Sequence, residues 1–325
     1  MDVKLGAIQS PPDHRDYLYR AIVQAEALPR KYSRRRMMGP VRDQGQYGTC
    51  VGFASAAVKD SHEGLITSPL YIYANAKKLD GIPNQEGTYC RTAMSVLLNK
   101  GVCPEDTLPY NQMRWPNLPT PTATADSEAL AYRVKAYASV LSIDEVKQSI
   151  VRDGPVLAAV LVCDSFVNAK DGYIPLPGSE GKADYIRGGH AVCVVGYDDD
   201  LAHGPYRGYF EVKNSWGPNW GQEGYCWIPY DFFNFRQPDI GMTYWWESWT
   251  SIDIITPPVA CTEGYLWIGS KTAVLDGREV ELDQPPTINP STGRTLVPMR
   301  FMAEHMGYQV DWSDSLRQIH FYKRK

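Results

Sequence analysis

The chain has 325 residues, of which 43% are hydrophobic and 22% are charged, and its formal net charge at pH 7 is -4. This length and composition are enough for a substantial core, favour two domains and exclude a disordered chain. The small net charge gives no overall field that would attract nucleic acid, and no apolar run reaches the roughly 18 residues of a membrane-spanning helix. The first residues contain no apolar stretch, so no secretory signal peptide is expected, and the sequence leaves the compartment open.

Seven cysteines are spread along the chain, which is too few for a disulfide scaffold, and their odd number leaves at least one unpaired. The sequence leaves open whether Cys90 and Cys103 form a disulfide. There is no C-x-x-C motif, and the run Asp198-Asp199-Asp200 is typical of a solvated loop rather than a calcium site. We therefore expect no metal and no cofactor.

The first third of the chain is expected to be mainly helical. Residues 1–28 form an N-terminal extension, and the basic run at 30–36 is typical of a solvated face, with a polyanion site as the less favoured reading. Helices are predicted from Cys50 to about residue 59, after the Ser68-Pro69 start signal, and over residues 91–99.

Beyond the proline-rich stretch at 115–121 the pattern changes from helices to strands. One more helix is predicted between the capping box Ser142-Ile143-Asp144-Glu145 and Gly154. Strands rich in Val, Tyr and Phe are predicted at residues 156–162, 190–197, 209–213 and 224–228. Helices followed by strands indicate an α+β domain, with a cleft between two lobes.

A second, smaller domain is expected after a proline-containing linker at residues 257–263. Asp276-Gly277 joins two predicted strands, a helix is expected from Pro298 to Gly307, and residues 310–312 and 319–321 are expected to close the domain as a hairpin. The predicted organisation is an extension at 1–28, a main domain at 29–256, the linker, and a small α+β domain at 264–325.

Cys50 stands at the predicted start of a helix, directly after a glycine-containing polar turn. A helix N-terminus stabilises a thiolate, and a neighbouring imidazolium would stabilise it further. Of the six histidines only His190 heads an apolar strand, with glycines before it that permit close approach of another backbone. Cys50 and His190 are therefore the candidate nucleophile and base.

Two amide side chains complete the candidate site. Asn214, at a strand end and followed by two tryptophans, can accept the ring N–H of His190 and so orient it. Gln44, six residues before Cys50, can donate with the backbone N–H of Cys50 to a developing oxyanion.

Residues 28–256 resemble the papain-like cysteine peptidases, a two-lobed α+β fold with a helical lobe and an antiparallel β lobe. The motifs that carry the resemblance are Gln44-Gly45, Gly48-Thr49-Cys50, Gly189-His190-Ala191 and Asn214-Ser215-Trp216-Gly217, in the family's order. The resemblance implies peptide-bond hydrolysis through a thioester, with Cys50 as nucleophile, His190 as base and acid, Asn214 as orienting group and Gln44 as oxyanion donor.

The resemblance also assigns residues to substrate binding. It places Ala159, Gly189 and Ala191 around the specificity pocket, which their small size makes roomy and apolar. It places Gly87 on the wall that pairs with substrate backbone and Trp216 over the Cys–His pair. Tyr47 stands where the family usually has a cysteine, so the usual nearby disulfide cannot form, as in bacterial-type members. The extension is too short for a long inhibitory propeptide, so either it lies over the cleft or activity is controlled elsewhere.

Residues 264–325 resemble the small domain named after the N-terminal region of copper amine oxidases. The match rests on Asp276-Gly277, Pro285-Pro286, residues 293–300, Gly307 and Val310-Asp311-Trp312. No copper chemistry is expected, because His305 and His320 are isolated from each other. The module is either a contact domain that holds the protein at a cell envelope or scaffold, which would favour a secreted or surface location, or a passive appendage.

The leading hypothesis is a cysteine peptidase acting on protein or peptide substrates, without nucleic acid, cofactor or transmembrane segment. The alternatives are a catalytically silent papain-fold binding protein and a thiol amidase or acyl transferase acting on cell wall. The choice between endo- and exopeptidase action stays open.

Overall fold

The chain forms two compact units, Met1–Asp253 and Ile254–Lys325, which are described separately. The structure is a computed structural model. It describes residues 3–21, 27–169, 171–179, 181, 183–236, 241, 243–253, 264–266, 268–275, 278–282, 284–289, 295–296, 309–313 and 318–322.

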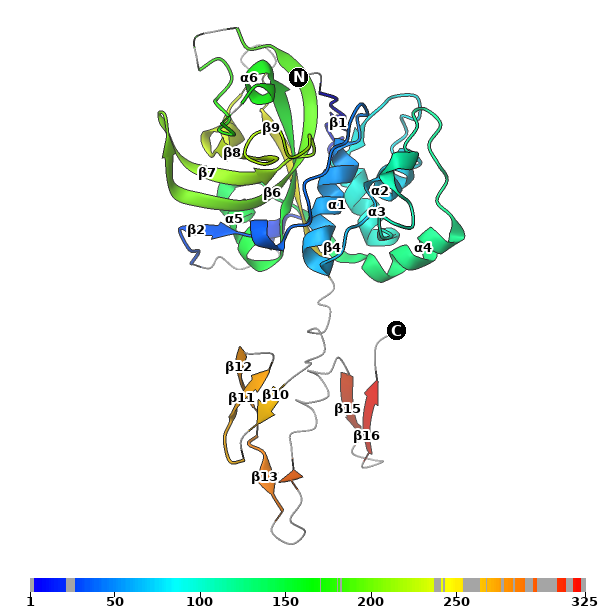
Figure 1. The fold of residues 1–325 in the computed structure, drawn as a ribbon, viewed down its shortest axis with the longest axis vertical. Helices are drawn as coiled ribbons and strands as arrows, with labels where there is room; N and C mark the ends of the chain where they lie inside the picture. Colours follow the sequence, from blue (N-terminus) through cyan, green and yellow to red (C-terminus); the bar gives the residue numbers. More distant parts are fainter. Residues whose placement is uncertain are drawn as a thin grey trace. The chain divides into compact units, whose positions relative to one another are not determined.

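One lobe of the first unit is helical. It contains α1 (Cys50–Glu63), α2 (Pro69–Lys77), α3 (Cys90–Asn99) and α4 (Ala123–Ala129), as Figure 1 shows in blue to green. Ser68 Oγ accepts the backbone N–H of Tyr71 at 3.0 Å and so caps α2, while α1 ends at Gly64, whose φ of 66° suits glycine. The three helices predicted here from caps and periodicity are confirmed, with α1 longer than expected.

The other lobe is a sheet of seven strands. Its order is β4 (Val134–Ser139), β9 (Trp245–Asp253), β5 (Val156–Cys163), β6 (Ile186–His203), β7 (Tyr206–Lys213) and β8 (Tyr225–Pro229), and β2 (Lys31–Ser33) pairs with β6. Neighbouring strands are antiparallel. Three short helices accompany the sheet: α5 (Ile143–Arg152), α6 (Asp164–Val167) and α7 (Asp231–Asn234).

The four predicted strands are confirmed, and β2, β4 and β9 were not predicted. β9 begins with Trp245 and Trp246 and continues through polar residues, so its sequence lacks the run of Val and Ile that signals a buried strand. Its place is decided by pairing on both sides, with β4 and β5.

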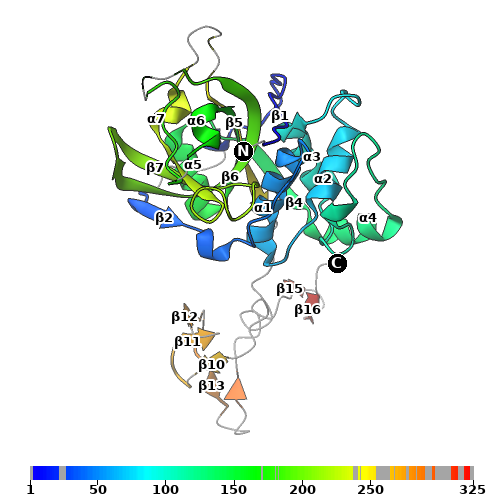
Figure 2. The ribbon, with the colours of Figure 1, turned by 45° about the horizontal axis from the view of Figure 1, so that its top comes forward.

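The two lobes meet where α1 packs against β5 and β6. Figures 1 and 2 show α1 at the centre of the unit, between the sheet and the other helices. Every residue of β5 is buried, and over residues 156–160 its side chains alternate between two hydrophobic clusters, with Leu157 and Ala159 in one and Ala158 and Val160 in the other. The start of α1 is therefore held next to β6.

The N-terminal extension runs along this junction. β1 (Ala7–Ile8) pairs in parallel with β3 (Thr88–Tyr89), and Leu18 forms a parallel bridge with Ser139 of β4. Both ribbon views place β1 beside the helical lobe, near α1 and α3 (Figures 1 and 2). Part of the extension therefore packs against the helical lobe and against the edge of the sheet.

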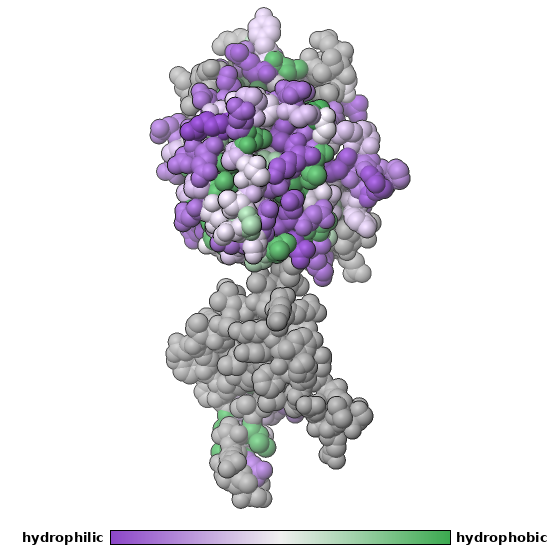
Figure 3. Space-filling model, turned by 90° about the vertical axis from the view of Figure 1, so that its right-hand side faces the viewer, coloured by the Kyte–Doolittle hydropathy of each residue, from purple (hydrophilic) through white to green (hydrophobic). Residues whose placement is uncertain are grey.

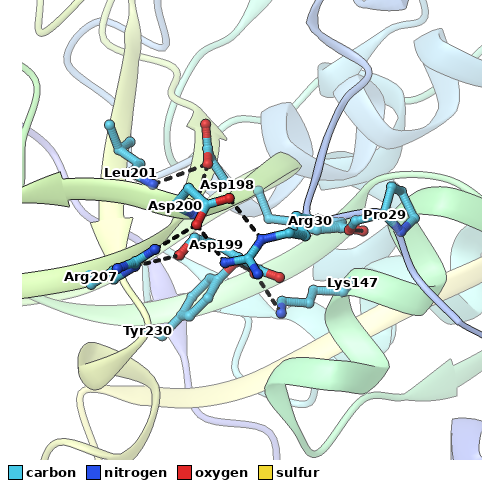
Figure 4. A network of polar contacts seen from close by, with 10 residues as sticks. Pro29, Arg30, Lys147, Asp198, Asp199, Asp200, Leu201, Arg207 and Tyr230 are labelled. Atoms are coloured by element: carbon cyan, nitrogen blue, oxygen red, sulfur yellow. Dashed lines mark hydrogen bonds and ion pairs between the residues drawn. The ribbon is translucent and has the colours of Figure 1, made fainter.

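Arg30 and Lys31 of the basic run are exposed, as expected, and they form ion pairs with two of the three consecutive aspartates. Figure 4 shows the aspartates surrounded by cations from three segments of the chain. The ion pairs are Arg30–Asp200, Lys31–Asp198, Lys147–Asp199 and Arg207–Asp200. Pairing of β2 with β6 brings these opposite charges together, which neither local sequence could show.

The outer surface of the first unit is polar on the side shown in Figure 3. Hydrophobic side chains are scattered there among hydrophilic ones. Within the described part of the chain, no helix has the length and apolar character to cross a membrane.

The second unit contains short antiparallel pairings. β10 (Gly264–Leu266), β11 (Thr272–Leu275) and β12 (Arg278–Glu281) form a three-stranded sheet, β13 (Thr287–Ile288) pairs with β14 (Thr295–Leu296), and β15 (Gln309–Ser313) pairs with β16 (Gln318–Tyr322). Both predicted strand pairs are confirmed. The predicted helix from Pro298, the linker at 257–263, Cys261 and His305 lie outside the described residues.

Candidate active site

Cys50 is the first residue of α1 and is fully buried. Its thiol lies against backbone amide groups of Ala191, Val51, Gly6 and Ala7. Ala191 follows His190 on β6, so the thiol of the predicted nucleophile lies beside the strand that carries the predicted base. Gly6 and Ala7 belong to the N-terminal extension, which therefore covers the thiol.

His190 is also fully buried, and its ring is held by Asn214. The Nε2 atom of His190 lies 2.7 Å from Oδ1 of Asn214, and the same oxygen accepts the backbone N–H of Ser215 at 2.8 Å. Because Oδ1 can only accept, the proton of the neutral ring resides on Nε2. The lone pair is then on Nδ1, which has no hydrogen-bond partner among the described residues and can act as a base.

Trp216 packs against a face of the His190 imidazole. Its ring centroid lies 4.5 Å from that of His190, with 27° between the planes, and Phe166 and Trp220 pack edge-on against Trp216. This apolar cover keeps water away from the His190–Asn214 hydrogen bond, which strengthens the bond and fixes the ring.

Gln44 is fully buried with its amide oriented by two neighbours. Its Oε1 accepts the hydroxyl of Ser215 at 2.7 Å, and its Nε2 donates to the carbonyl of Tyr47 at 2.8 Å. The same Nε2 donates to the carbonyl of Lys4 at 3.0 Å. The amide predicted to bind an oxyanion thus binds a peptide carbonyl from the extension.

The extension occupies the cleft as an extended chain. The backbone N–H of Thr88 donates to the carbonyl of Gly6 at 2.9 Å. A Cβ atom added at Gly6 would collide with the backbone of Gly48, two residues before Cys50, so only glycine allows this close approach.

Burial shifts both ionisable groups toward their neutral forms. Desolvation raises the pKa of Cys50 to about 11, although nearby backbone N–H groups oppose the shift. Desolvation lowers the pKa of His190 to about 4, opposed by the hydrogen bond to Asn214. Both shifts favour the neutral thiol and the neutral imidazole over a thiolate and an imidazolium.

The residues assigned to the specificity pocket are together, and the space beside Gly189 is filled. Ala159 and Ala191 are opposite each other on β5 and β6 and are buried. A Cβ on Gly189 would collide with the indole of Trp246 and with the carbonyl of Ala7. The space next to the Cα atom of Gly189 is thus taken by a side chain from β9 and by the extension.

On the cleft wall, the residue that bonds to the extension is Thr88 rather than its neighbour. Gly87, the predicted wall residue, has φ of 95° and donates its N–H to the hydroxyl of Tyr73 at 2.9 Å. A Cβ there would lie 2.5 Å from the Gly6 carbonyl oxygen, so Gly87 gives the extension room while Thr88 supplies the hydrogen bond.

Sequence reasoning missed Thr88, Ser215 and Trp246. Ser215 could have been found, because it stands beside Asn214 and a buried amide such as Gln44 needs a partner to define its orientation. The roles of Thr88 and Trp246 depend on pairing with distant segments. Cys90 and Cys103 are both free thiols.

Other features contribute nothing to this site. A surface cavity of about 620 Å³, lined by Tyr173, His203 and Tyr209 among others, shares no residue with it. Among the described residues, no group of three His, Cys, Asp or Glu side chains is arranged to hold a metal ion.

Comparisons with known proteins agree with this architecture. Residues 28–235 match the family described as papain family cysteine protease, and residues 240–321 match the copper amine oxidase N-terminal domain. The solved structure of xylellain, a cysteine protease from Xylella fastidiosa, aligns with a TM-score of 0.63 and 30% identity, covering 77% of this chain and 96% of xylellain.

Curated relatives match over the peptidase region. A peptidase C1-like protein of Acanthamoeba polyphaga mimivirus is 30% identical over 210 residues, covering 58% of this chain and 64% of the relative. Pro-cathepsin H of Bos taurus is 30% identical over 200 residues, covering 57% of this chain and 54% of the relative. The chain thus spans less than two thirds of the length of either relative. From the site geometry and these matches, we conclude that the chain belongs to the papain family of cysteine proteases, and that a copper amine oxidase N-terminal domain follows its peptidase domain.

Proposed function

We propose that this protein is a cysteine peptidase whose catalytic residues are Cys50, His190, Asn214 and Gln44. One observation carries the proposal furthest: the site already holds an extended polypeptide. The Lys4 carbonyl accepts from Gln44 and the Gly6 carbonyl accepts from Thr88, so the cleft recognises peptide backbone through the groups that a substrate would use. The substrate class is therefore a protein or peptide.

The proposed reaction proceeds through a thioester. His190 Nδ1 takes the thiol proton of Cys50, and the thiolate attacks the carbonyl carbon of the scissile bond. The oxyanion is bound by Gln44 Nε2–H and the backbone N–H of Cys50. The C–N bond breaks as His190 returns the proton to the leaving amine, and a water molecule, deprotonated by the same Nδ1, then hydrolyses the thioester.

The covered form described above is, in this proposal, inactive. The extension places Lys4 at the oxyanion donor and buries the thiol, so substrate enters only after residues 4–8 leave the cleft. Access of water would then remove the desolvation that raises the pKa of Cys50 and lowers that of His190. We further propose that residues 264–325 form a contact module separate from the catalytic unit.

The test uses the full chain with Gly6→Leu, which forces the extension out of the cleft without altering the proposed catalytic residues. Gln9→Leu is the matched control, because Gln9 is exposed on the same segment. We expect the Gly6→Leu chain to cleave peptides and to be labelled at Cys50 by an epoxysuccinyl inhibitor. The wild type and Gln9→Leu chains should react at least tenfold more slowly, a factor equivalent to about 1.4 kcal/mol.

Adding Cys50→Ala should abolish both signals. A Gly6→Leu chain whose Cys50 reacts with iodoacetamide but which cleaves no peptide would favour the silent binding protein. Cleavage of cell-wall amides without peptide cleavage would favour the thiol amidase.

A further inference from the structure

A buried ammonium group lies beneath the cleft wall, outside the proposed catalytic residues. Lys77 ends α2, and its side chain is 4% exposed. Its Nζ donates to three backbone carbonyls, those of Ile82 at 2.9 Å, Gln85 at 2.7 Å and Gly87 at 3.0 Å. Burying a charge costs free energy unless the charge is paired and hydrogen-bonded, so the ammonium group of Lys77 can be buried here because of these contacts.

The counterion is the carboxylate of Asp80, which is completely buried. Asp80 Oδ2 lies 2.8 Å from Lys77 Nζ and accepts the hydroxyl of Thr88 at 2.9 Å, while Oδ1 accepts the backbone N–H of Ile82 at 3.0 Å. Together Lys77 and Asp80 hold the loop at residues 80–88 at three places. They contact Ile82 near its start, Gln85 in its middle, and Gly87 and Thr88 at its end. The loop contains no cysteine, so no disulfide holds it.

This loop touches the proposed active site at two points. The backbone N–H of Thr88 bonds to the Gly6 carbonyl of the chain in the cleft. The carboxylate of Glu86 accepts the backbone N–H of Gly48 at 2.9 Å, two residues before Cys50. A shift of the loop would therefore move the peptide-binding wall and the turn that carries the thiol.

We propose that Lys77 is a positioning residue for peptide binding: with Asp80 it holds the loop at 80–88 so that Thr88 presents its N–H to a peptide carbonyl. The proposal deepens the proposed function, because it explains how the same cleft keeps its peptide-binding edge. Lys77 does not touch the peptide. It acts through the carbonyl of Gly87 and through Asp80, which binds the side chain of Thr88.

The first test probes the peptide-binding wall at Gly87 and Thr88 directly. It uses the full chain, in which the extension is the bound peptide. Lys77→Met removes the donors at nearly constant volume, and Lys78→Met is the control, because the neighbouring Lys78 is exposed. Hydrogen exchange of the Gly87 and Thr88 amides and alkylation of Cys50 by iodoacetamide should both be at least about tenfold faster in Lys77→Met, since the wall loses part of its hold on the extension. Amides of Val194 and Val212, in the β6–β7 ladder, should exchange at the wild-type rate, which separates local loosening from general destabilisation.

A double variant controls for misfolding that an unpaired Asp80 carboxylate would cause in Lys77→Met. Lys77→Met with Asp80→Asn leaves no unpaired buried charge, so it should be the more stable variant, yet it still lacks donors for the three carbonyls. Fast exchange at Thr88 in this variant supports positioning by Lys77. If the double variant, or a folded Lys77→Met chain, exchanges Thr88 and alkylates Cys50 at the wild-type rate, the proposal is wrong.

The second readout uses cleavage by the Gly6→Leu chain. There Lys77→Met should raise KM for a peptide about tenfold and lower kcat by a smaller factor, because the loop mainly forms the peptide-binding wall and contacts the turn before Cys50 only through Glu86. If no Gly6→Leu chain cleaves peptide, the proposed function fails, and the exchange measurement still decides the role of Lys77.

Discussion

The carbonyl oxygen of Lys4 accepts a hydrogen bond from the side-chain amide of Gln44 at 3.0 Å, across 40 positions of the chain. A group suited to an oxyanion is thus occupied by a neutral carbonyl of the protein's own backbone. The same amide is held from behind by the Ser215 hydroxyl. Ser215 therefore orients the Gln44 amide and Lys4 occupies it, and this occupancy is one reason why we propose that the covered form is inactive.

Ser215 should affect catalysis through Gln44. Ser215→Ala removes the hydrogen bond to Gln44 Oε1, so the amide can rotate and lose its donor position. In the Gly6→Leu chain we expect kcat to fall by about tenfold, corresponding to about one hydrogen bond, with KM within twofold. Steady-state kinetics with a peptide substrate measures both constants.

Two comparisons check that interpretation. Ser179→Ala, at an exposed serine, should leave kcat unchanged. Ser215→Ala combined with Gln44→Ala should cost no more than Gln44→Ala alone; additive losses would show that Ser215 acts by another route.

The ion pair between Asp16 and Arg91 should retain the extension. Its atoms are 2.8 Å apart, and both side chains are less than one fifth exposed. Asp16→Asn should speed alkylation of Cys50 by about fivefold, because a partly buried pair contributes about 1 kcal/mol.

Asp13→Asn is the matched control for Asp16. Asp13 pairs with Arg15 inside the extension itself, so its loss should not change docking. Equal alkylation rates for the two variants would contradict a retaining role for the Asp16–Arg91 pair.

His190 should make stability depend on pH. Its pKa is about 4 in the folded protein, against an ordinary value of 6.5, so the unfolded chain binds more protons between these values. The resulting stability is present above about pH 6.5 and is lost as pH falls toward 4, by up to about 3 kcal/mol.

Urea unfolding of wild type and His190→Gln between pH 4 and 7 tests this dependence. The variant side chain is neutral throughout, so the difference in free energy of unfolding between the two proteins should itself vary with pH. Parallel curves would mean that the pKa of His190 is the same in the folded and unfolded chains.

The ion pairs of Figure 4 should contribute unequally to stability. The Lys147 side chain is 12% exposed, lies 2.6 Å from Asp199 and packs over the rings of Tyr197 and Tyr230. Lys147→Met should cost about 2 kcal/mol, because it leaves a partly buried carboxylate short of its counterion.

Arg30→Met is the comparison for Lys147→Met. The Arg30 side chain is 69% exposed, and its partner Asp200 keeps Arg207, so the loss of stability should be much smaller than in Lys147→Met. Urea denaturation of both variants gives the difference, and equal costs would show that burial does not separate the pairs.

Much of the site could be predicted from the sequence because its signals are local. A cysteine after a glycine turn, a histidine heading an apolar strand and an asparagine before tryptophan each report their surroundings within a few residues. The caps of α2 and α5 are likewise local: Ser68 and Ser142 accept backbone N–H groups three residues ahead. Family, lobe order and the candidate residues follow from such patterns.

The state and finer structure of the cleft are decided by tertiary structure. Residues 4–8 lie over Cys50 because Gly6 fits against Gly48 and because Thr88, 82 positions along the chain, offers its N–H. The same long-range packing places Trp246 beside Gly189 and buries Lys77 among carbonyls. The amino-acid sequence specifies which chemical groups the site contains. Their protonation, orientation and occupancy depend on burial and on pairing between distant segments, and both arise only when the two lobes pack together.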